Sequence, residues 1–136
     1  MYDKVLTLSR LDQAQARIEA MAREMAAEGD GMPLAPAVDK AMDLARELLR
    51  ILLDAEGKRY EADADLLQLW KVLVKGEPHW NTIRDNCREL VYYHNCLDLG
   101  REDALPPQPR KMIVHTLRHL YLYLRSHCEQ SPEETA

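Results

Sequence analysis

Apolar residues recur at intervals of three and four along most of this 136-residue chain. Residues at this spacing fall on one side of an α-helix, so the pattern predicts amphipathic helices. No long stretch alternates between apolar and polar residues, as the exposed strands of a sheet do. The sequence therefore predicts an all-α fold, an antiparallel helical bundle of about five helices.

Glycine and proline mark the ends of the predicted helices. Asn81 or Thr82 is expected to cap the fourth helix, because both side chains accept hydrogen bonds from free backbone N–H groups. The loop before the fifth helix contains three prolines and is of a length that suits a crossover within one domain. We therefore expect a single domain over residues 1–128, followed by a disordered acidic tail over 129–136. The five predicted helices span about 5–27, 37–56, 66–74, 82–99 and 110–128.

The second predicted helix has a broad apolar face, with Leu44, Leu48 and Ile51 widening the stripe that begins at Val38. A face this wide indicates contact from more than one side, and covering it led us to expect a homodimer. Because the chain has no Phe, Trp70 and Trp80 are expected to be the largest side chains of an aliphatic core.

Composition narrows the classes of function. The chain has 18 Lys and Arg against 23 Asp and Glu, a formal net charge of -5, which argues against a duplex-DNA binder that neutralises phosphates. It has no apolar run of membrane-spanning length and no apolar leader, so a soluble, cytoplasmic protein is expected. Three cysteines without a CxxC pair indicate buried free thiols rather than a zinc site or a disulfide framework.

The last predicted helix is locally basic. Four cations and no acid lie between residues 110 and 127, so this stretch could bind an anion or an acidic partner. Acidic residues in segment 54–65 and in the tail could instead neutralise it, within the fold or across a homodimer. His115 and His119, spaced i and i+4, could chelate a metal or be ordinary surface residues, and no metal or cofactor is expected. The four cations are Arg110, Lys111, Arg118 and Arg125.

The stretch from Arg84 to Asp98 is the richest in side chains that can carry out chemistry. Arg88 is a permanent cation that can stabilise a charged phosphorus centre, and His94 can transfer protons at neutral pH, a combination that suits metal-free RNA cleavage. Residues six apart on a helix lie about 240° apart around its axis, so the two do not share a face. His94 also falls on the apolar stripe of its helix, where a hydrogen-bonded core histidine is the alternative. Supporting contacts are expected from Arg84, Tyr92, Tyr93 and Asn95.

Two stretches resemble the HEPN superfamily of small helical-bundle proteins, which includes toxin ribonucleases and partners of minimal nucleotidyltransferases. One is the Arg88-x5-His94 pattern in a late helix, and the other is the run from Ala41 to Leu73. The resemblance implies a homodimer with both pairs in one cleft, where Arg88 holds phosphate, His94 acts as acid or base and no metal is needed. It also allows a divergent, inactive relative.

A second hypothesis involves no catalysis. In it the bundle is a dimeric interaction module that docks an acidic protein through its basic last helix. Substitution of His94 would then reduce stability, and substitution of Arg88 would have little effect.

Overall fold

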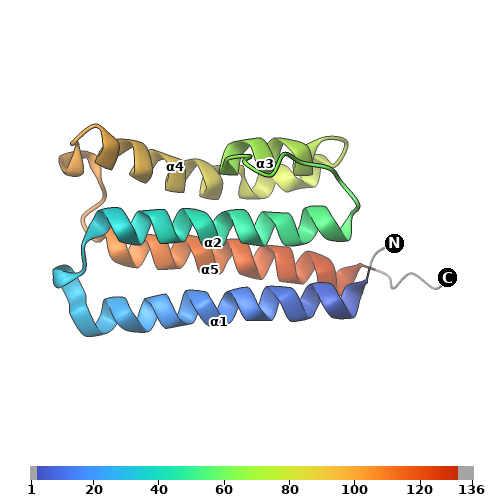
Figure 1. Ribbon diagram of the computed structural model, residues 1–136, viewed down its shortest axis with the longest axis horizontal. Coiled ribbons are helices and arrows are strands. Elements are labelled where there is room, and N and C mark those ends of the chain that lie inside the picture. Colours follow the sequence, from blue (N-terminus) through green and yellow to red (C-terminus); the bar gives the residue numbers. More distant parts are fainter. Residues whose placement is uncertain (1–2, 132–136) are drawn as a thin grey trace.

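Four long helices run alternately up and down around one core in the computed structural model, which describes residues 3–131 (Figure 1). Within that range there is no strand, so the predicted all-α bundle of five helices is confirmed. The α-helices are α1 (Lys4–Glu28), α2 (Leu34–Ala55), α3 (Leu66–Val74), α4 (Arg84–Asp98) and α5 (Pro109–Gln130), and the 3-10 helices are η1 (Gly29–Gly31), η2 (Pro78–Ile83) and η3 (Glu102–Ala104).

Local sequence explains where most helices begin and end. The Asp3 carboxylate accepts a hydrogen bond from the backbone of Leu6 at 2.9 Å and caps α1. Asp65 and Gln68 cap α3 reciprocally, each side chain accepting from the other's backbone N–H. Gly57 and Gly100 follow the ends of α2 and α4 with φ of 68° and 69°, a conformation that glycine adopts without strain. These positions agree with the predicted breaks.

Two helix starts differ from the prediction. Helix α2 begins at Leu34 rather than after Pro36, because a proline in the first turn removes only an N–H group that has no partner within the helix. The expected cap of α4 by Asn81 or Thr82 is wrong. Helix η2 leads directly into α4, the Arg84 N–H bonds to the Asn81 carbonyl, and the Asn81 amide donates to the carbonyl of Pro78 at 3.0 Å.

The end of α5 lies close to the predicted position. The helix runs to Gln130, two residues past the expected 128, so the first residues of the predicted tail are helical. Residues 132–136 of that tail lie outside the described residues. At this end of the bundle α1 and α5 are joined, because the Lys4 ammonium donates to the Glu129 carbonyl at 2.7 Å.

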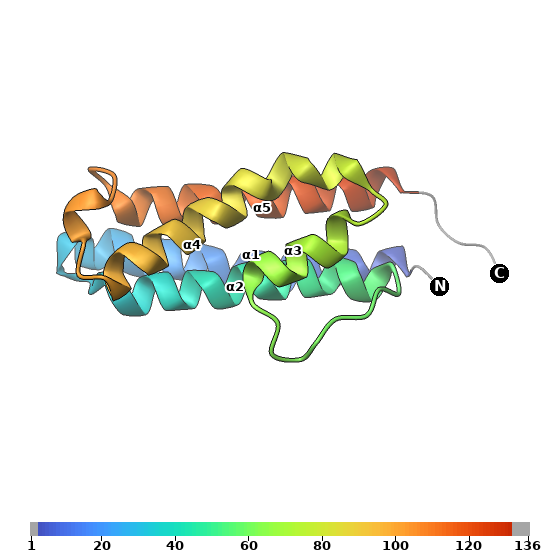
Figure 2. The same cartoon turned by 90° about the horizontal axis from the view of Figure 1, so that it is seen from above.

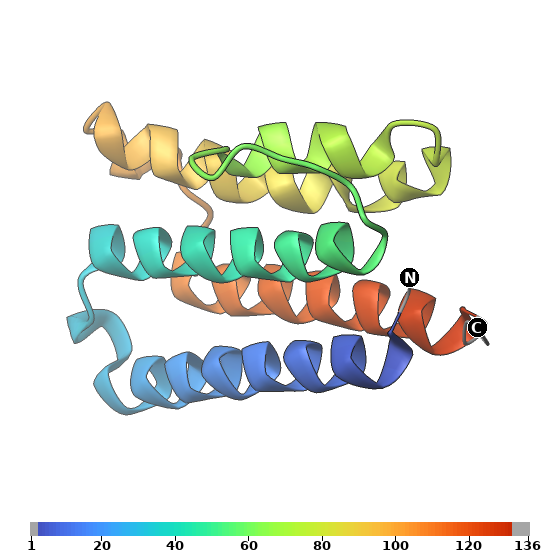
Figure 3. The same cartoon turned by 45° about the vertical axis from the view of Figure 1, so that its right-hand side comes forward.

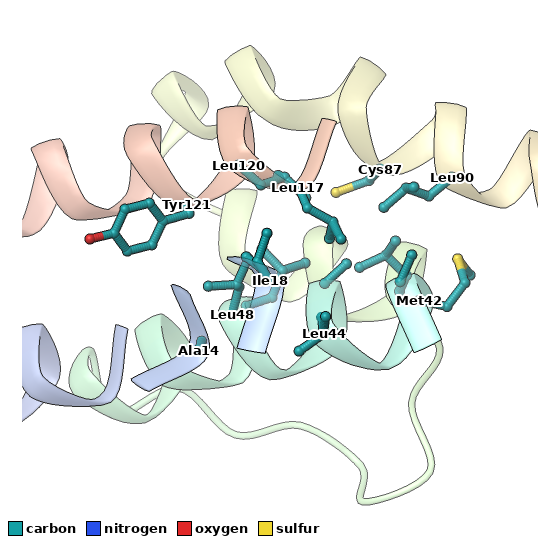
Figure 4. Packing of buried hydrophobic residues seen from close by; sticks show 14 of the residues in the cluster. Ala14, Ile18, Met42, Leu44, Leu48, Cys87, Leu90, Leu117, Leu120 and Tyr121 are labelled. Atoms are coloured by element: carbon teal, nitrogen blue, oxygen red, sulfur yellow. The ribbon is translucent and has the colours of Figure 1, made fainter. Parts of the chain in front are cut away.

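Helix α2 lies at the centre of the packing, in contact with α1, α3, α4 and α5. Leu44 and Leu48 face the core together with Ile18 of α1 and Leu117 of α5 (Figure 4). The wide apolar face of α2 is thus covered by helices of the same chain, and it gives no reason to invoke a second subunit. Its buried residues are Ala37, Val38, Ala41, Met42, Leu44, Ala45, Leu48, Leu49, Ile51, Leu52 and Leu53.

Helix α3 is inserted in the connection between α2 and α4. After α2, residues 56–65 turn back along the bundle before α3 begins, and η2 then reverses the chain into α4 (Figures 2 and 3). Trp80 of η2 is fully buried, as the sequence predicted, and Trp70 of α3 donates its indole N–H to the Trp80 carbonyl at 2.9 Å. The insertion brings η2 to the end of the bundle where α2 ends. None of the helices in the described part of the chain is long and apolar enough to cross a membrane.

Candidate functional site

Glu89 fixes α4 against α5. Its Oε1 accepts a hydrogen bond from the Tyr93 hydroxyl, and its Oε2 accepts one from the Thr116 hydroxyl of α5 at 3.3 Å. Tyr93 and Thr116 are both buried, and burial together with the bond to Glu89 raises the pKa of the Tyr93 hydroxyl. Glu89 therefore points into the contact between the two helices, and its bond to Thr116 sets their register.

Arg88 lies on the solvent side of α4. Its side chain is exposed and makes no hydrogen bond or ion pair with any residue between 3 and 131. Helices α4 and α5 are antiparallel and in contact (Figure 2), so the register at Glu89 and Thr116 brings Arg88 level with the turn of α5 that carries His115 and His119.

The two histidines face the same side as Arg88. Arg88 is about 100° from Glu89 around α4, and His115 and His119 are about 100° and 60° from Thr116 around α5, in each case away from the buried residues. Both imidazoles are exposed. Hereafter the outer α4–α5 face means the exposed residues Arg84, Asp85, Arg88, Tyr92, Asn95 and Leu99 together with Lys111, His115, His119 and Leu122.

The supporting residues predicted around Arg88 have different positions. Tyr92 is 50% exposed, and its hydroxyl donates to the Ala104 carbonyl at 3.0 Å. Arg84 is exposed, with its Nε 3.5 Å from the Asp85 carboxylate, and Asn95 is exposed as well. Tyr93 is 3% exposed, so it supports the packing of α4 on α5 rather than the surface.

His94 occupies a different place from Arg88. It is half-buried, with Nδ1 3.5 Å from Asp39 of α2 and Nε2 3.1 Å from Asp98 of α4. It lines a surface cavity of about 400 Å³ that Arg88 does not line. One chain therefore does not bring Arg88 and His94 to one site, and His94 is neither fully buried in the core nor free. The other lining residues are Asp39, Met42, Asp43, Arg46, Asp65, Leu66, Leu67, Val91 and Asn95.

Three of the four cations predicted to form an anion surface on α5 bind groups of the same chain. Arg110 donates to the Met32 carbonyl at 2.9 Å. Arg118 binds both carboxylate oxygens of Glu19 of α1, at 2.9 and 2.6 Å, and this lowers the pKa of Glu19. Lys111 is exposed.

Arg125 is the third of these cations, 3.5 Å from Asp12 of α1 and 3.1 Å from Glu129 of α5. The acids that pair with these cations therefore come from α1 and, with Glu129, from the start of the predicted tail, whereas Asp54 of segment 54–65 pairs with Arg10 at 3.0 Å. The sequence showed the excess of positive charge on α5 but not which helix would compensate it.

A second group of polar side chains, which the sequence analysis missed, lies where α2 ends. We call it the end cluster: Glu56, Lys58, Glu77, His79 and His127. Lys58 Nζ lies 3.1 Å from Glu56 and binds Glu77, and His127 Nε2 lies 3.9 Å from Glu56. The five residues come from three separate stretches of the chain, and no spacing in the sequence connects them.

The cysteines are buried, and the histidines of the described chain are not grouped as metal ligands. Cys87, Cys96 and Cys128 are free and buried, as expected, and burial raises the pKa of the Cys87 thiol to about 12. Among residues 3–131, no group of three or more His, Cys, Asp or Glu side chains is placed to hold a metal ion. His115 and His119 are thus surface histidines without a third ligand in the described chain.

Comparisons with known proteins identify no relative of this chain. No protein-family model, no curated protein and no solved structure matches it.

Proposed function

We propose that this protein binds single-stranded RNA on the outer α4–α5 face and cleaves it without a metal ion. In this proposal Arg88 binds the scissile phosphate, and His115 and His119 transfer protons. The observation that carries the proposal is the exposure of these three side chains at one level of two adjacent antiparallel helices. Arg88 is available for a ligand because it has no partner within residues 3–131.

RNA cleavage without a metal needs three kinds of group. A base removes the proton of the ribose 2′-hydroxyl, whose oxygen attacks phosphorus, and an acid protonates the departing 5′-oxygen. A cation stabilises the additional negative charge on the phosphate oxygens. The products are a 2′,3′-cyclic phosphate and a 5′-hydroxyl. Two imidazoles that are four residues apart on a helix lie about 6 Å apart at Cβ, close enough to act on opposite sides of one phosphate.

The proposal keeps the role of Arg88 that the HEPN resemblance implies and changes the histidine. His94 lies between the carboxylates of Asp39 and Asp98, and the cavity beside it is also lined by Asp43 and Asp65. Arg46 pairs with Asp43 on the cavity wall, but the two carboxylates beside the imidazole, together with Asp65, leave an excess of negative charge that repels a phosphate. His115 and His119 have no carboxylate partner between residues 3 and 131.

Charge on this face favours a short single strand over a duplex. Arg88 and Lys111 are its unpaired cations, and Asp85 partly neutralises Arg84. Two phosphate contacts give weak binding, with a slope of log affinity against log salt of about -1.4 for single strands. Tyr92 offers an exposed aromatic ring next to Arg88, four residues along the same side of α4, on which an unpaired base can stack.

The test uses a fluorescently labelled single-stranded RNA and measures both binding and cleavage in EDTA. We expect Arg88→Ala to weaken binding at least tenfold and His115→Ala or His119→Ala to abolish cleavage while binding persists. Arg17→Ala is the matched control, because Arg17 is an exposed arginine of α1 without a described partner. Loss of cleavage in His94→Ala but not in His115→Ala and His119→Ala would assign the reaction to His94. Absence of RNA binding by the wild-type protein would refute the proposal.

The same face supports one other candidate function, the docking of an acidic protein. Leu99 and Leu122 are 77% and 61% exposed on it, and apolar side chains beside cations are typical of protein interfaces. Here Leu122→Ser would abolish partner binding and leave RNA binding intact. Light scattering of the wild-type protein and of Leu122→Ser would show whether a second copy of the chain is the partner.

A further inference from the structure

The end cluster joins three parts of the chain through one ammonium group. Lys58, just after α2, donates to the Leu73 carbonyl at the end of α3 at 2.7 Å. The same nitrogen binds the carboxylate of Glu77, in the turn before η2, and lies 3.1 Å from Oε2 of Glu56. Lys58 is 22% exposed and Glu56 12% exposed, so this contact is largely shielded from water.

The histidines of the cluster cover Trp80. The rings of His79 and His127 stack at a centroid distance of 4.8 Å, and the His127 ring lies 4.5 Å from that of Trp80. Tyr123 of α5 donates its hydroxyl to the His79 carbonyl at 3.1 Å. Trp80 is fully buried, and its indole N–H has no hydrogen-bond partner among the residues that the structure describes. The seating of η2 therefore keeps the largest core side chain away from water.

The pKa values of Glu56, Glu77 and His127 are all shifted within the end cluster. Burial and a hydrogen bond to Glu77 raise the pKa of Glu56 to about 7. Burial opposes the change at Glu77, but hydrogen bonds from Lys58 and Glu56 lower the pKa of that carboxyl. The two carboxyl groups that contact the one ammonium of Lys58 thus differ, because the pKa of Glu77 is lowered and that of Glu56 is raised. Burial and the neighbouring His79 lower the pKa of His127, which keeps its imidazole neutral.

We propose that the end cluster is a pH-sensitive contact that holds η2 over Trp80 in slightly acidic solution and weakens as the pH rises through neutrality. Once Glu56 has lost its proton, two half-buried carboxylates share the single charge of Lys58 and repel each other. The other groups that face Glu56 are His127 from α5 and, stacked on it, His79 from η2. Neither described surface cavity is lined by the cluster, which favours a conformational role over ligand binding.

The pH dependence of the contact follows from the directions in which the pKa values of Glu56 and His127 are shifted. Glu56 has a raised pKa in the folded protein, so its contribution to stability is present at low pH and is lost as the pH rises to about 7. His127 has a lowered pKa, so its contribution is present above 6.5 and is lost as the pH falls. The Glu56 contribution is lost by the time the pH exceeds about 7, so the contact is tighter in slightly acidic solution than in neutral or alkaline solution.

Fluorescence of Trp80 tests this proposal. The chain has two tryptophans, so Trp70→Phe leaves Trp80 as the only indole and serves as the background for both proteins compared. Between pH 5.5 and 9 we expect its emission maximum to shift to longer wavelength, with a midpoint near pH 7. Glu56→Gln, which cannot ionise, is expected to abolish the shift. Amide hydrogen exchange of residues 76–83 is expected to accelerate at least fivefold over the same range in wild-type protein only.

Two results would overturn the proposal. One is an emission maximum that does not move with pH in the background protein, and the other is an equal shift in Glu56→Gln. Circular dichroism at 222 nm checks that the variants fold. If Glu56→Gln does not fold, Glu77→Gln replaces it, because loss of the Glu77 charge is expected to move the midpoint to lower pH, and an unchanged midpoint then counts against the proposal.

Discussion

Replacing Lys58 with methionine tests how much the end cluster contributes to folding. Methionine retains most of the apolar stem and removes the ammonium group. The Leu73 carbonyl, at the end of α3, then loses a charged donor at 2.7 Å, a bond worth about 1.5 to 3 kcal/mol. The ion pair with Glu77, which is 35% exposed, adds about 0.5 to 1 kcal/mol. Glu56 adds little, because it can take up a proton when the cation is removed.

The sum is a loss of about 2 to 4 kcal/mol at pH 7, or about 10 °C in Tm for a domain of this size. Urea unfolding followed at 222 nm measures it, and the slope of free energy against urea should not change. Lys75→Met is the control, because Lys75 lies in the exposed turn after α3 without a described partner, and its loss should change stability by less than about 0.5 kcal/mol. Equal stability of the two variants would refute the reasoning that Lys58 joins three segments.

Three further predictions concern the core and the charges. Leu48→Ala, which empties a fully buried site at the centre of α2, is expected to cost about 3 to 4 kcal/mol in urea unfolding. Arg118→Gln breaks the contact with Glu19, but these side chains are 50% and 34% exposed, so its cost should stay below about 1 kcal/mol and fall further in 1 M salt. Glu56→Gln is expected to become more stable than wild type by about 2 to 3 kcal/mol on going from pH 5 to pH 8, measured by the same method, because glutamine has no proton to lose.

The helices could be predicted because their signals are local. The stripe of α1 from Leu11 to Met25 is buried as its spacing indicated, and Gly57 and Gly100 follow the ends of α2 and α4. The predicted apolar side of α4 was partly wrong, because Tyr93 and Cys96 are buried whereas His94 is only half-buried. Contact of α4 with α5 decides this, and a single helix does not reveal which side its neighbour covers.

The candidate site was predictable only in part. Spacing alone separates Arg88 from His94, since six residues correspond to about 240° of a helix. That Arg88 lies level with His115 depends on the register of α4 against α5. The bond from Thr116 to Glu89 identifies this register, which cannot be predicted from the sequence. The end cluster joins residues up to 71 positions apart, from Glu56 to His127, so it required the tertiary structure.

The pairing of α1 with α5 has a consequence for synthesis of the chain. Helix α1 leaves the ribosome before the other four helices of this bundle, but it packs against α2 and against α5, which follows all of them. Until α5 has emerged, Leu11, Ile18 and the wide apolar face of α2 have no complete cover, so a nascent chain of about 100 residues exposes the surface that later becomes the core. Chains that stop before α5 are therefore expected to bind chaperones or aggregate.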